Sequence, residues 1–203
     1  MMKKKHKRKY SKTGLALMLS GVLLVAVALL LVEFNIWQDL HAGDVRDSII
    51  EEIKKREPTS ASGDYEVAPL MEMPTVEING YLYVGTLIVP SLELELPVLD
   101  RWDDSRLKIS PCRYLGSVYQ DNMIIAAHNY RSHFGRLKDL KVGDEVGFTD
   151  VDGNNFRYVI SETQLLDKTD IEGMESGSWD LTLFTCTVGG ASRVTIRCMR
   201  IKD

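Results

Sequence analysis

The stretch Thr-Leu-Phe-Thr-Cys, residues 182–186, decides how the end of this chain folds. It is a short apolar run that contains threonine, and this pattern predicts a buried strand. Residues 187–192 contain a Gly-Gly pair, and residues 193–199 alternate apolar with polar side chains. The two runs therefore predict a pair of antiparallel strands joined by a short loop.

The spacing around this loop also predicts which residues face each other. If the pairing is symmetric about residues 187–192, Cys186 lies opposite Arg193, and directly opposed residues share a face of the sheet. Arg197 then pairs near Thr182, roughly 13 Å down the strand at ~3.3 Å per residue. We therefore expect Arg193 to reach a group held on Cys186, and a lysine in place of Arg197 to have a mild effect.

Cys186 is the candidate nucleophile. A cysteine reacts as its thiolate, which needs partial exposure and a basic or hydrogen-bonding neighbourhood. A strand end beside Arg193 offers both, whereas the alternative for any single cysteine is a buried structural role. The chain has three cysteines, an odd number, so at least one thiol of an external domain is unpaired. Cys198 is expected in the core, and Cys112 could be either a core residue or a free thiol. A disulfide between them stays open, and the cysteine spacing predicts no zinc site.

A histidine is needed to activate the thiol and to supply a proton to a leaving amine. The chain has four. His6 lies in the basic N-terminus and His41 lies close to a long apolar segment, so neither suits this role. His128 ends the apolar run at residues 123–127, which predicts a buried strand whose last residue emerges at a sheet edge. His133, in the following loop, is the runner-up.

These residues, in this chain order, resemble the sortase family. Sortases carry a histidine at the end of one barrel strand, a Thr-Leu-x-Thr-Cys motif on another, and an arginine at the start of the final strand. The chain has His128, residues 182–186 and Arg193 in the same order. The likeness also covers residues 85–98, which are similar to the opening strands of the family, and spans about residues 81–201 in all.

Two departures leave the subclass open. The more usual Gly-His pair is Ala127-His128 in this chain, and the loop from Cys186 to Arg193 is shorter than in many housekeeping members. Neither departure removes a candidate catalytic group.

The resemblance implies an all-β domain, a closed eight-stranded barrel with its site in a groove on the wall. The sequence agrees, because many short strands with turn signals and few helices are typical of a closed barrel. Short helices are expected within residues 102–109 and 135–140. Residues 152–155 predict a hairpin turn. The acidic stretch at 150–153 does not predict a calcium loop, because it lacks the ligand order and the distant glutamate of an EF-hand.

The activity implied by the resemblance is that of a cysteine transpeptidase. Cys186 would cleave a Leu-Pro-x-Thr-Gly-like sorting signal through a thioester, His128 would move the protons, and Arg193 would stabilise the oxyanion. Thr185 would contribute to substrate binding. The implied acceptor is an amine on a cell-wall precursor or a pilin lysine. No cofactor is implied, although some relatives are stimulated by calcium.

Two other classes are weighed against this one. The L,D-type transpeptidases of the cell wall resemble Ser-x-Gly-Cys followed closely by arginine, whereas this chain has Phe-Thr-Cys-Thr-Val at residues 184–188. A non-catalytic anchored binding module would explain a helix, a linker and a barrel without any need for Cys186.

The N-terminal region predicts a single-pass membrane protein. Residues 13–32 contain no charge and are long enough to cross a ~30 Å hydrocarbon core. Seven basic residues and no acidic residue precede Glu33, so the N-terminus is expected to be cytoplasmic and the catalytic domain extracellular. The basic residues would also contact anionic lipid. A signal peptide cleaved after residues 26–28 is the alternative, but residues 29–32 continue the apolar run.

The charge is distributed unevenly along the chain. Removing those seven basic residues leaves 25 − 7 = 18 basic against 29 acidic residues, a net charge of −11 beyond the span. Nucleic acid is therefore not expected as a partner, since binding phosphate needs a basic surface. Helical spacing of apolar residues over 35–56 predicts an amphipathic helix, and the small polar residues 59–64 predict a linker. The expected organisation is a cytoplasmic tail, a span, a helix with linker and a barrel, at residues 1–12, 13–32, 33–75 and 76–203.

Overall fold

The protein is described by a computed structural model that covers residues 12–56 and 71–202, without the side chains of residues 38–45. The basic residues before Lys12 and the linker expected at 59–64 lie outside the described residues. The chain divides into two compact units, Met1–Gln38 and Asp39–Asp203.

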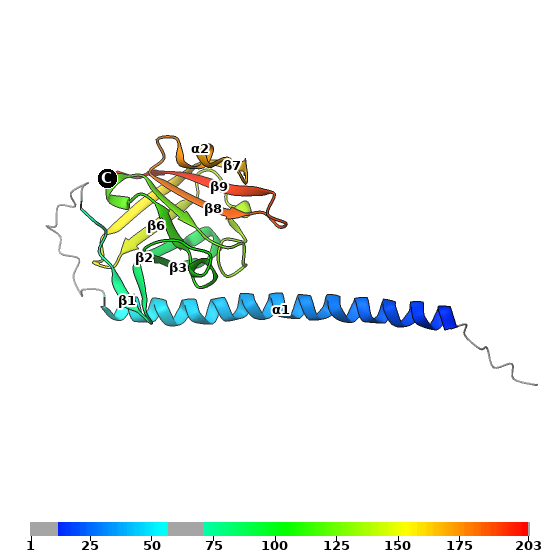
Figure 1. Ribbon diagram of the computed structural model, residues 1–203. Coiled ribbons are helices and arrows are strands. Elements are labelled where there is room, and N and C mark those ends of the chain that lie inside the picture. The colour runs from blue at the N-terminus through cyan, green and yellow to red at the C-terminus, as the bar shows by residue number, and fades with distance from the viewer. Residues whose placement is uncertain (1–11, 57–70, 203) are drawn as a thin grey trace, which may run out of the picture. The chain divides into compact units, whose positions relative to one another are not determined.

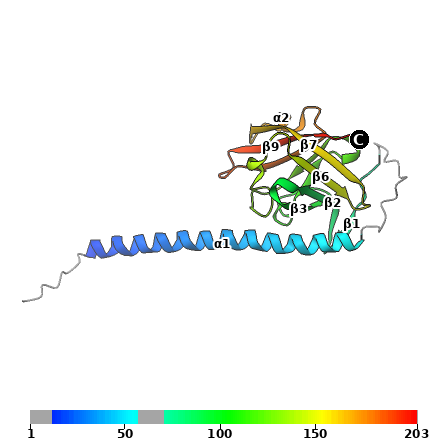
Figure 2. The same cartoon turned by 180° about the vertical axis from the view of Figure 1, so that it is seen from behind.

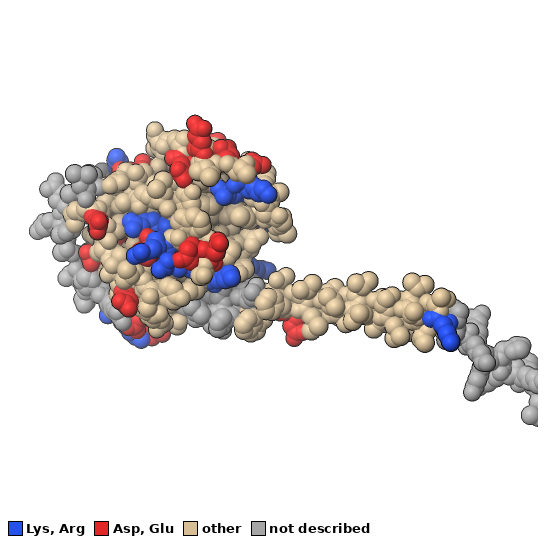
Figure 3. Space-filling view, in the orientation of Figure 1, with Lys and Arg blue, Asp and Glu red and all other residues tan. Residues whose placement is uncertain are grey.

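A single long helix, α1 (Lys12–Arg56), begins in the first unit. The most apolar 18 residues of its segment Lys12–Trp37 have a mean hydropathy of 3.0, and none of these 18 residues is buried. At ~1.5 Å per residue the 26 residues of the whole segment extend beyond the ~30 Å of a hydrocarbon core. The space-filling view shows a surface nearly without charge along this stretch (Figure 3). The helix thus fits a membrane anchor, and the segment predicted to span the membrane lies within it.

The second unit contains a closed barrel of eight strands, which can be followed in Figures 1 and 2. The strands follow one another around the barrel in the order β2-β3-β4-β5-β8-β9-β7-β6, and pairing of β2 with β6 closes it. The short strand β1 (Val76–Ile78) adds to β2 outside this ring. The eight strands are β2 (Tyr81–Val89), β3 (Leu94–Leu99), β4 (Cys112–Leu115), β5 (Met123–Ala126), β6 (Glu145–Asp150), β7 (Asn155–Asp167), β8 (Leu181–Cys186) and β9 (Ser192–Arg200). The eight-stranded barrel expected from the sequence is confirmed.

Only short helices interrupt the strands. Four are 3₁₀ helices and one, α2 (Ile171–Glu175), is a short α-helix. The 3₁₀ helices are Pro90–Leu92, Arg106–Lys108, Val118–Gln120 and Leu137–Asp139. Two of them fall within the ranges where the sequence predicts short helices, and β6 and β7 are joined by the turn expected at residues 152–155.

The barrel closes where β2 approaches β6. Gly85 pairs with Asp150 at this seam and has a φ of 153°. A Cβ atom at this position would overlap the carbonyl oxygen of Thr149, so only glycine allows the two strands to come this close. Inside the seam the buried carboxylate of Asp150 accepts a hydrogen bond of 2.6 Å from the hydroxyl of Tyr119.

Two of the three cysteines belong to different apolar clusters. Cys198 lies in the barrel interior with Leu181, Leu183 and Ile196. Cys112 faces the other side of the sheet, and its thiol lies 3.3 Å from the carbonyl oxygen of Ser110. Both thiols are free, and burial raises the pKa of each to about 12. The disulfide left open by the sequence is therefore absent.

The last turns of α1 form a second core on the outside of the barrel. Ile49 and Ile53 are 2% and 1% exposed, and they pack in one cluster with Tyr83, Leu99 and Cys112. The helical spacing of apolar residues in the sequence places these isoleucines on one face. This part of the helix therefore belongs to the folded domain.

We expect Ile53→Ala to lower the free energy of unfolding by about 2–4 kcal/mol, because it removes a buried side chain and leaves a cavity. Urea unfolding of the full chain, followed by tryptophan fluorescence, measures this loss. Val188→Ala is the control, since Val188 is 95% exposed. Equal stability of the two variants would show that the helix end does not contribute to the fold.

Candidate active site

Three adjacent strands bring the candidate residues to one end of the barrel. Cys186 is the last residue of β8 and pairs with Arg193 on β9, which confirms the register predicted from the loop. On its other side β8 runs parallel to β5, with Ala126 paired to Phe184. His128 and Cys186 each lie two residues beyond that pair, so the two side chains reach the same level of the barrel.

Cys186 is the exposed thiol of the chain. All three cysteines lie in the part that the structure describes, and the other two are fully buried. Strand alternation places Cys186 on the outer face of the sheet together with Phe184, while the intervening Thr185 lies on the inner side. A reagent in solution can therefore reach this sulfur but not those of Cys112 and Cys198.

His128 is half-buried beside the strand end. Within the described residues its Nε2 atom is shielded from solvent and has no hydrogen-bond partner. Burial lowers the pKa of His128, the positive charge of Lys108 lowers it further, and Asp104 acts in the opposite direction. The imidazole is thus poised as a neutral base whose protonated form is a comparatively strong acid.

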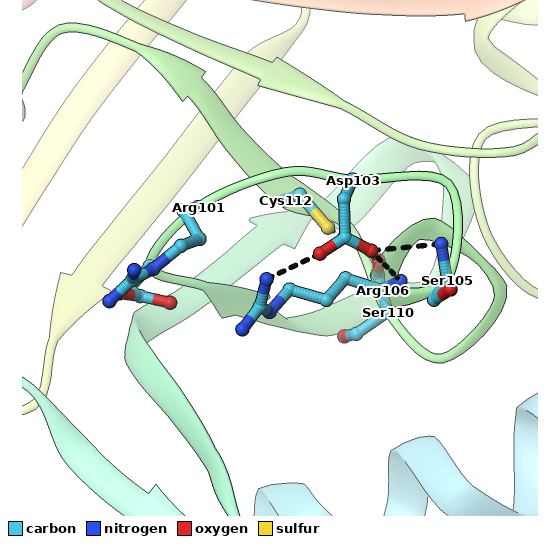
Figure 4. Close-up of polar contacts among 7 residues, drawn as sticks. Arg101, Asp103, Ser105, Arg106, Ser110 and Cys112 are labelled. Atoms are coloured by element: carbon cyan, nitrogen blue, oxygen red, sulfur yellow. Dashed lines mark hydrogen bonds and ion pairs between the residues drawn. The ribbon is translucent and has the colours of Figure 1, made fainter.

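The segment that joins β3 to β4 supplies the charges near His128. Asp103 accepts hydrogen bonds from the main-chain nitrogens of Ser105 (2.9 Å) and Arg106 (2.8 Å), and it also pairs with the Arg106 guanidinium (Figure 4). These bonds fold the segment into a compact turn that leads into the helix carrying Lys108. Sequence reasoning missed Lys108 and Asp104, because their approach to His128 depends on strand order.

His133, the runner-up, lies in a different environment. Its side chain is fully buried, and the centre of its ring lies 5.5 Å from the centre of the Tyr130 ring. The Tyr130 ring also packs against the ring of His128, with centres 5.0 Å apart. Burial separates His133 from any substrate in solution. His128 is therefore the better placed of the two histidines.

An aromatic row supports Arg193. The guanidinium carbon of Arg193 lies 5.4 Å from the centre of the Phe184 ring, within range of a cation–π interaction. Phe184 meets the edge of Tyr114, with ring centres 5.5 Å apart, and Tyr114 lies 5.4 Å from Trp102. The row holds the arginine on the same outer face as Cys186.

Arg197 has a structural environment that the sequence did not reveal. It is 1% exposed, and its guanidinium donates to Thr182 Oγ1 (3.0 Å), Gln164 Oε1 (3.0 Å) and the carbonyl oxygens of Met174 (2.9 Å) and Gly173. It thereby fastens α2 to the barrel wall. The mild effect on turnover expected for Arg197→Lys stays a prediction, and the structure adds an expected loss of stability, because a single ammonium cannot replace this planar set of donors.

Thr185 is 3% exposed and its hydroxyl is engaged with the main chain. Its Oγ1 atom donates a hydrogen bond of 2.8 Å to the carbonyl oxygen of Ala127, the residue before His128. The side chain thus joins β8 to the chain that carries the histidine.

A hollow of about 330 Å³ opens beside Cys186. One side is formed by residues 185–188 at the end of β8 and by Val194 on β9. The other side is formed by the segment after β5, through Asn129, Phe134, Gly135 and Lys138. Cys186 itself lines the hollow together with Thr185 and Val194, whereas Arg193 does not line it.

Comparison with known proteins gives a match to one family. The model of the sortase domain family matches residues 87–201, more than half of the chain. No curated protein matches the sequence. Among solved structures, a sortase D5 transpeptidase of Clostridium perfringens is 19% identical, with a TM-score of 0.59 over 78% of this chain and 99% of that one.

Two further solved structures are similar at comparable levels. Sortase C-3 of Streptococcus pneumoniae is 22% identical, with a TM-score of 0.54 over 80% of this chain and 84% of that one. Sortase C1 of Streptococcus agalactiae is 23% identical, with a TM-score of 0.54 over 63% and 72%. At these identities the structural likeness concerns the fold. The family match over residues 87–201 establishes that this chain belongs to the sortase family, the cysteine transpeptidases of the bacterial cell surface.

Proposed function

We propose that this sortase cleaves a Leu-Pro-x-Thr-Gly-like sorting signal through a thioester on Cys186 and transfers the protein to an amine acceptor. The observation that carries the proposal is the placement of an exposed cysteine between His128 and Arg193 at the ends of three neighbouring strands. A nucleophile, a proton carrier and a cation that lie together at neighbouring strand ends are the components that acyl transfer needs.

In the first half of the reaction the Cys186 thiolate attacks the carbonyl carbon of the Thr-Gly bond. A C–S bond forms, the C–N bond breaks, and protonated His128 gives its proton to the departing glycine amine. The buried position of His128, which lowers its pKa, favours that donation because it makes the imidazolium a stronger acid.

In this proposal Arg193 stabilises the oxyanion and binds the backbone of the sorting-signal peptide. Its guanidinium faces the same side of the sheet as Cys186, and the Phe184 ring fixes its direction. Donors held in place before the reaction stabilise developing charge without reorganisation. For substrate binding, Thr185 contributes to the lining of the hollow, and its bond to Ala127 sets the position of His128 relative to the sulfur.

In the second half an amine attacks the thioester. A C–N bond forms, the C–S electron pair returns to sulfur, and neutral His128 accepts the proton that the nitrogen loses. No step in this scheme uses a cofactor.

We further propose that α1 anchors the enzyme with its N-terminus in the cytoplasm and the barrel outside. The described span Lys12–Trp37 and the basic residues before it support this orientation. Protease added to intact protoplasts should degrade the barrel. A protected barrel, or a mature form that begins near Leu29, would contradict the proposal.

The test of function uses the full chain in detergent micelles, with a library of sorting-signal peptides and triglycine as acceptor. Mass spectrometry should detect an acyl adduct on Cys186 and a peptide product joined to triglycine. The other class of function is an anchored binding module, for which neither product would form with any peptide.

The positive charge of Lys108 near His128 leads to a separate prediction about the pH dependence of the reaction. Lys108→Glu replaces a charge that lowers the pKa of His128 with one that raises it. We therefore expect the limb of the pH–rate profile that reports His128 ionisation to move to higher pH. The measurement is kcat/KM for peptide cleavage as a function of pH.

Lys168→Glu is the matched control, because it makes the same charge change on the exposed turn after β7 and does not influence His128. Equal displacement of the limb in both variants would mean that only the net charge matters. An unchanged profile in Lys108→Glu would show that another group controls the limb.

A further inference from the structure

The hollow beside Cys186 continues into a second one along the segment after β5. The second hollow has a volume of about 370 Å³ and shares Asn129, Gly135 and Lys138 with the first. Two additional cations, Arg131 and Arg136, line it. A molecule that enters here can therefore extend from the sulfur along a surface rich in positive charge.

The charge of this surface is unusual for the protein. Arg131, Arg136 and Lys138 face the single acid Asp139, whereas the chain beyond the span has a net charge of −11 from 18 basic and 29 acidic residues. Arg136 is partly engaged, because it donates to the carbonyl oxygen of Leu92 (2.9 Å) and lies 3.9 Å from Asp139. Arg131 and Lys138 are exposed and form no ion pair with any other described residue.

The hollow gives Cys186 an approach that Arg193 does not line. Arg193 and the aromatic row lie on the outer face, and none of them lines the hollow, whose lining includes Cys186 together with Thr185 and Val194. A transpeptidase must hold an acyl group on sulfur while a second substrate arrives. An acceptor that enters through the hollow leaves Arg193 free to contact the acyl group.

We propose that the two adjoining hollows bind the acyl acceptor, and that this acceptor is an amine bearing a nearby carboxylate, as in a cell-wall peptide precursor. Arg131 and Lys138 hold the carboxylate while the amine reaches the thioester. This assignment rests on the proposed function. A lysine within a folded pilin has no carboxylate attached beside its side-chain amine, so it does not match this surface.

The chemistry of the step agrees with this placement. The nitrogen lone pair of the acceptor forms the C–N bond at the thioester carbonyl, and the C–S pair leaves as the Cys186 thiolate. His128 takes the proton from nitrogen. The carboxylate takes no part in bond making, so its effect should appear in acceptor binding.

The experiment is a competition between triglycine and triglycinamide at equal concentration, with the full chain in detergent and one sorting-signal peptide. The two acceptors carry similar amines and differ in the carboxylate alone. An isotopic label distinguishes the products by mass. We expect triglycine to be preferred about 3- to 10-fold at low salt, as for one or two exposed ion pairs, and the preference to fall as salt is added.

Variants of Arg131 and Lys138 test whether the preference for triglycine arises from these two cations. Arg131→Gln with Lys138→Gln should bring the ratio close to one, and Lys138→Glu should favour the amide. Lys141→Gln, which removes an exposed charge just outside both hollows, should retain the wild-type ratio. Because each ratio is measured within one reaction, differences in overall rate between variants do not affect it.

The outcomes separate this inference from the proposed function. Transfer to both acceptors with a ratio near one, or with the amide preferred, overturns the inference while leaving the transpeptidase activity established. A triglycine preference that persists in the Arg131 and Lys138 variants also overturns it. Absence of any acyl adduct on Cys186 rejects both.

Discussion

Replacing Cys186 with alanine should abolish both the acyl adduct and peptide cleavage, a loss of roughly 10⁴-fold or more in kcat. The reason is that the sulfur forms the covalent bond, and no other thiol of the chain is exposed in the described structure. Intact-protein mass spectrometry after incubation with a sorting-signal analogue detects the adduct. Cleavage of a fluorogenic peptide measures the rate.

Cys112→Ala and Cys198→Ala are the controls. Both thiols are buried and their pKa values are raised to about 12, so neither supplies a thiolate. We expect each control to keep the adduct and to lower the free energy of unfolding by about 0.5–3 kcal/mol, as is common for core substitutions. An adduct that persists in Cys186→Ala and disappears in either control would transfer the nucleophile to another residue.

Replacing Arg193 with lysine should lower kcat for peptide cleavage by roughly 10² to 10³-fold, the usual cost of losing one preorganised donor to an oxyanion. A lysine keeps the charge but has no planar fork of donors, and it forms a weaker interaction with the Phe184 ring. The free energy of unfolding should stay close to that of the wild type. Steady-state kinetics and urea unfolding together test both halves of the expectation.

Two other arginines on the barrel, Arg197 and Arg157, are the comparison for Arg193, because a lysine at either position should affect stability and rate differently. Arg197→Lys should lower the stability by about 1–3 kcal/mol, because buried acceptors of α2 and β8 lose their donor. Arg157→Lys should change neither quantity, since Arg157 forms only an exposed pair with Glu145. If Arg193→Lys resembled Arg157→Lys in its kinetics, the proposed oxyanion role would be wrong.

The hairpin of β8 and β9 was predictable because its information is local. A short loop with two glycines leaves few registers for the strands on either side, and the alternation of residues 193–199 selects among them. The pairing of Cys186 with Arg193 followed from this alone. The contrast between Arg193 and Arg197 did not, because the acceptors that bury Arg197 come from Gln164 and from α2.

The environment of His128 shows more clearly what could not be predicted from the sequence. A run of apolar residues ending in histidine indicates a strand end, but the partner of that strand lies 58 residues further along the chain. The charges that act on the imidazole come from the β3–β4 segment, which precedes it by about 20 residues. Neither of these separations along the chain produces a local pattern that could be recognised in a single sequence.

The sequence by itself determined the apolar N-terminal helix that fits a membrane anchor, the barrel class, the hairpin register and the identity of the candidate nucleophile, since each depends on residue types and periodicity over short distances. Only the tertiary structure decided which side chains surround Cys186, that the end of α1 packs into the domain, and that Arg131 and Lys138 continue the hollow beside the sulfur. These features depend on which strands are neighbours in the closed barrel. Closure brings together residues that are distant along the chain, and local propensity does not encode those contacts.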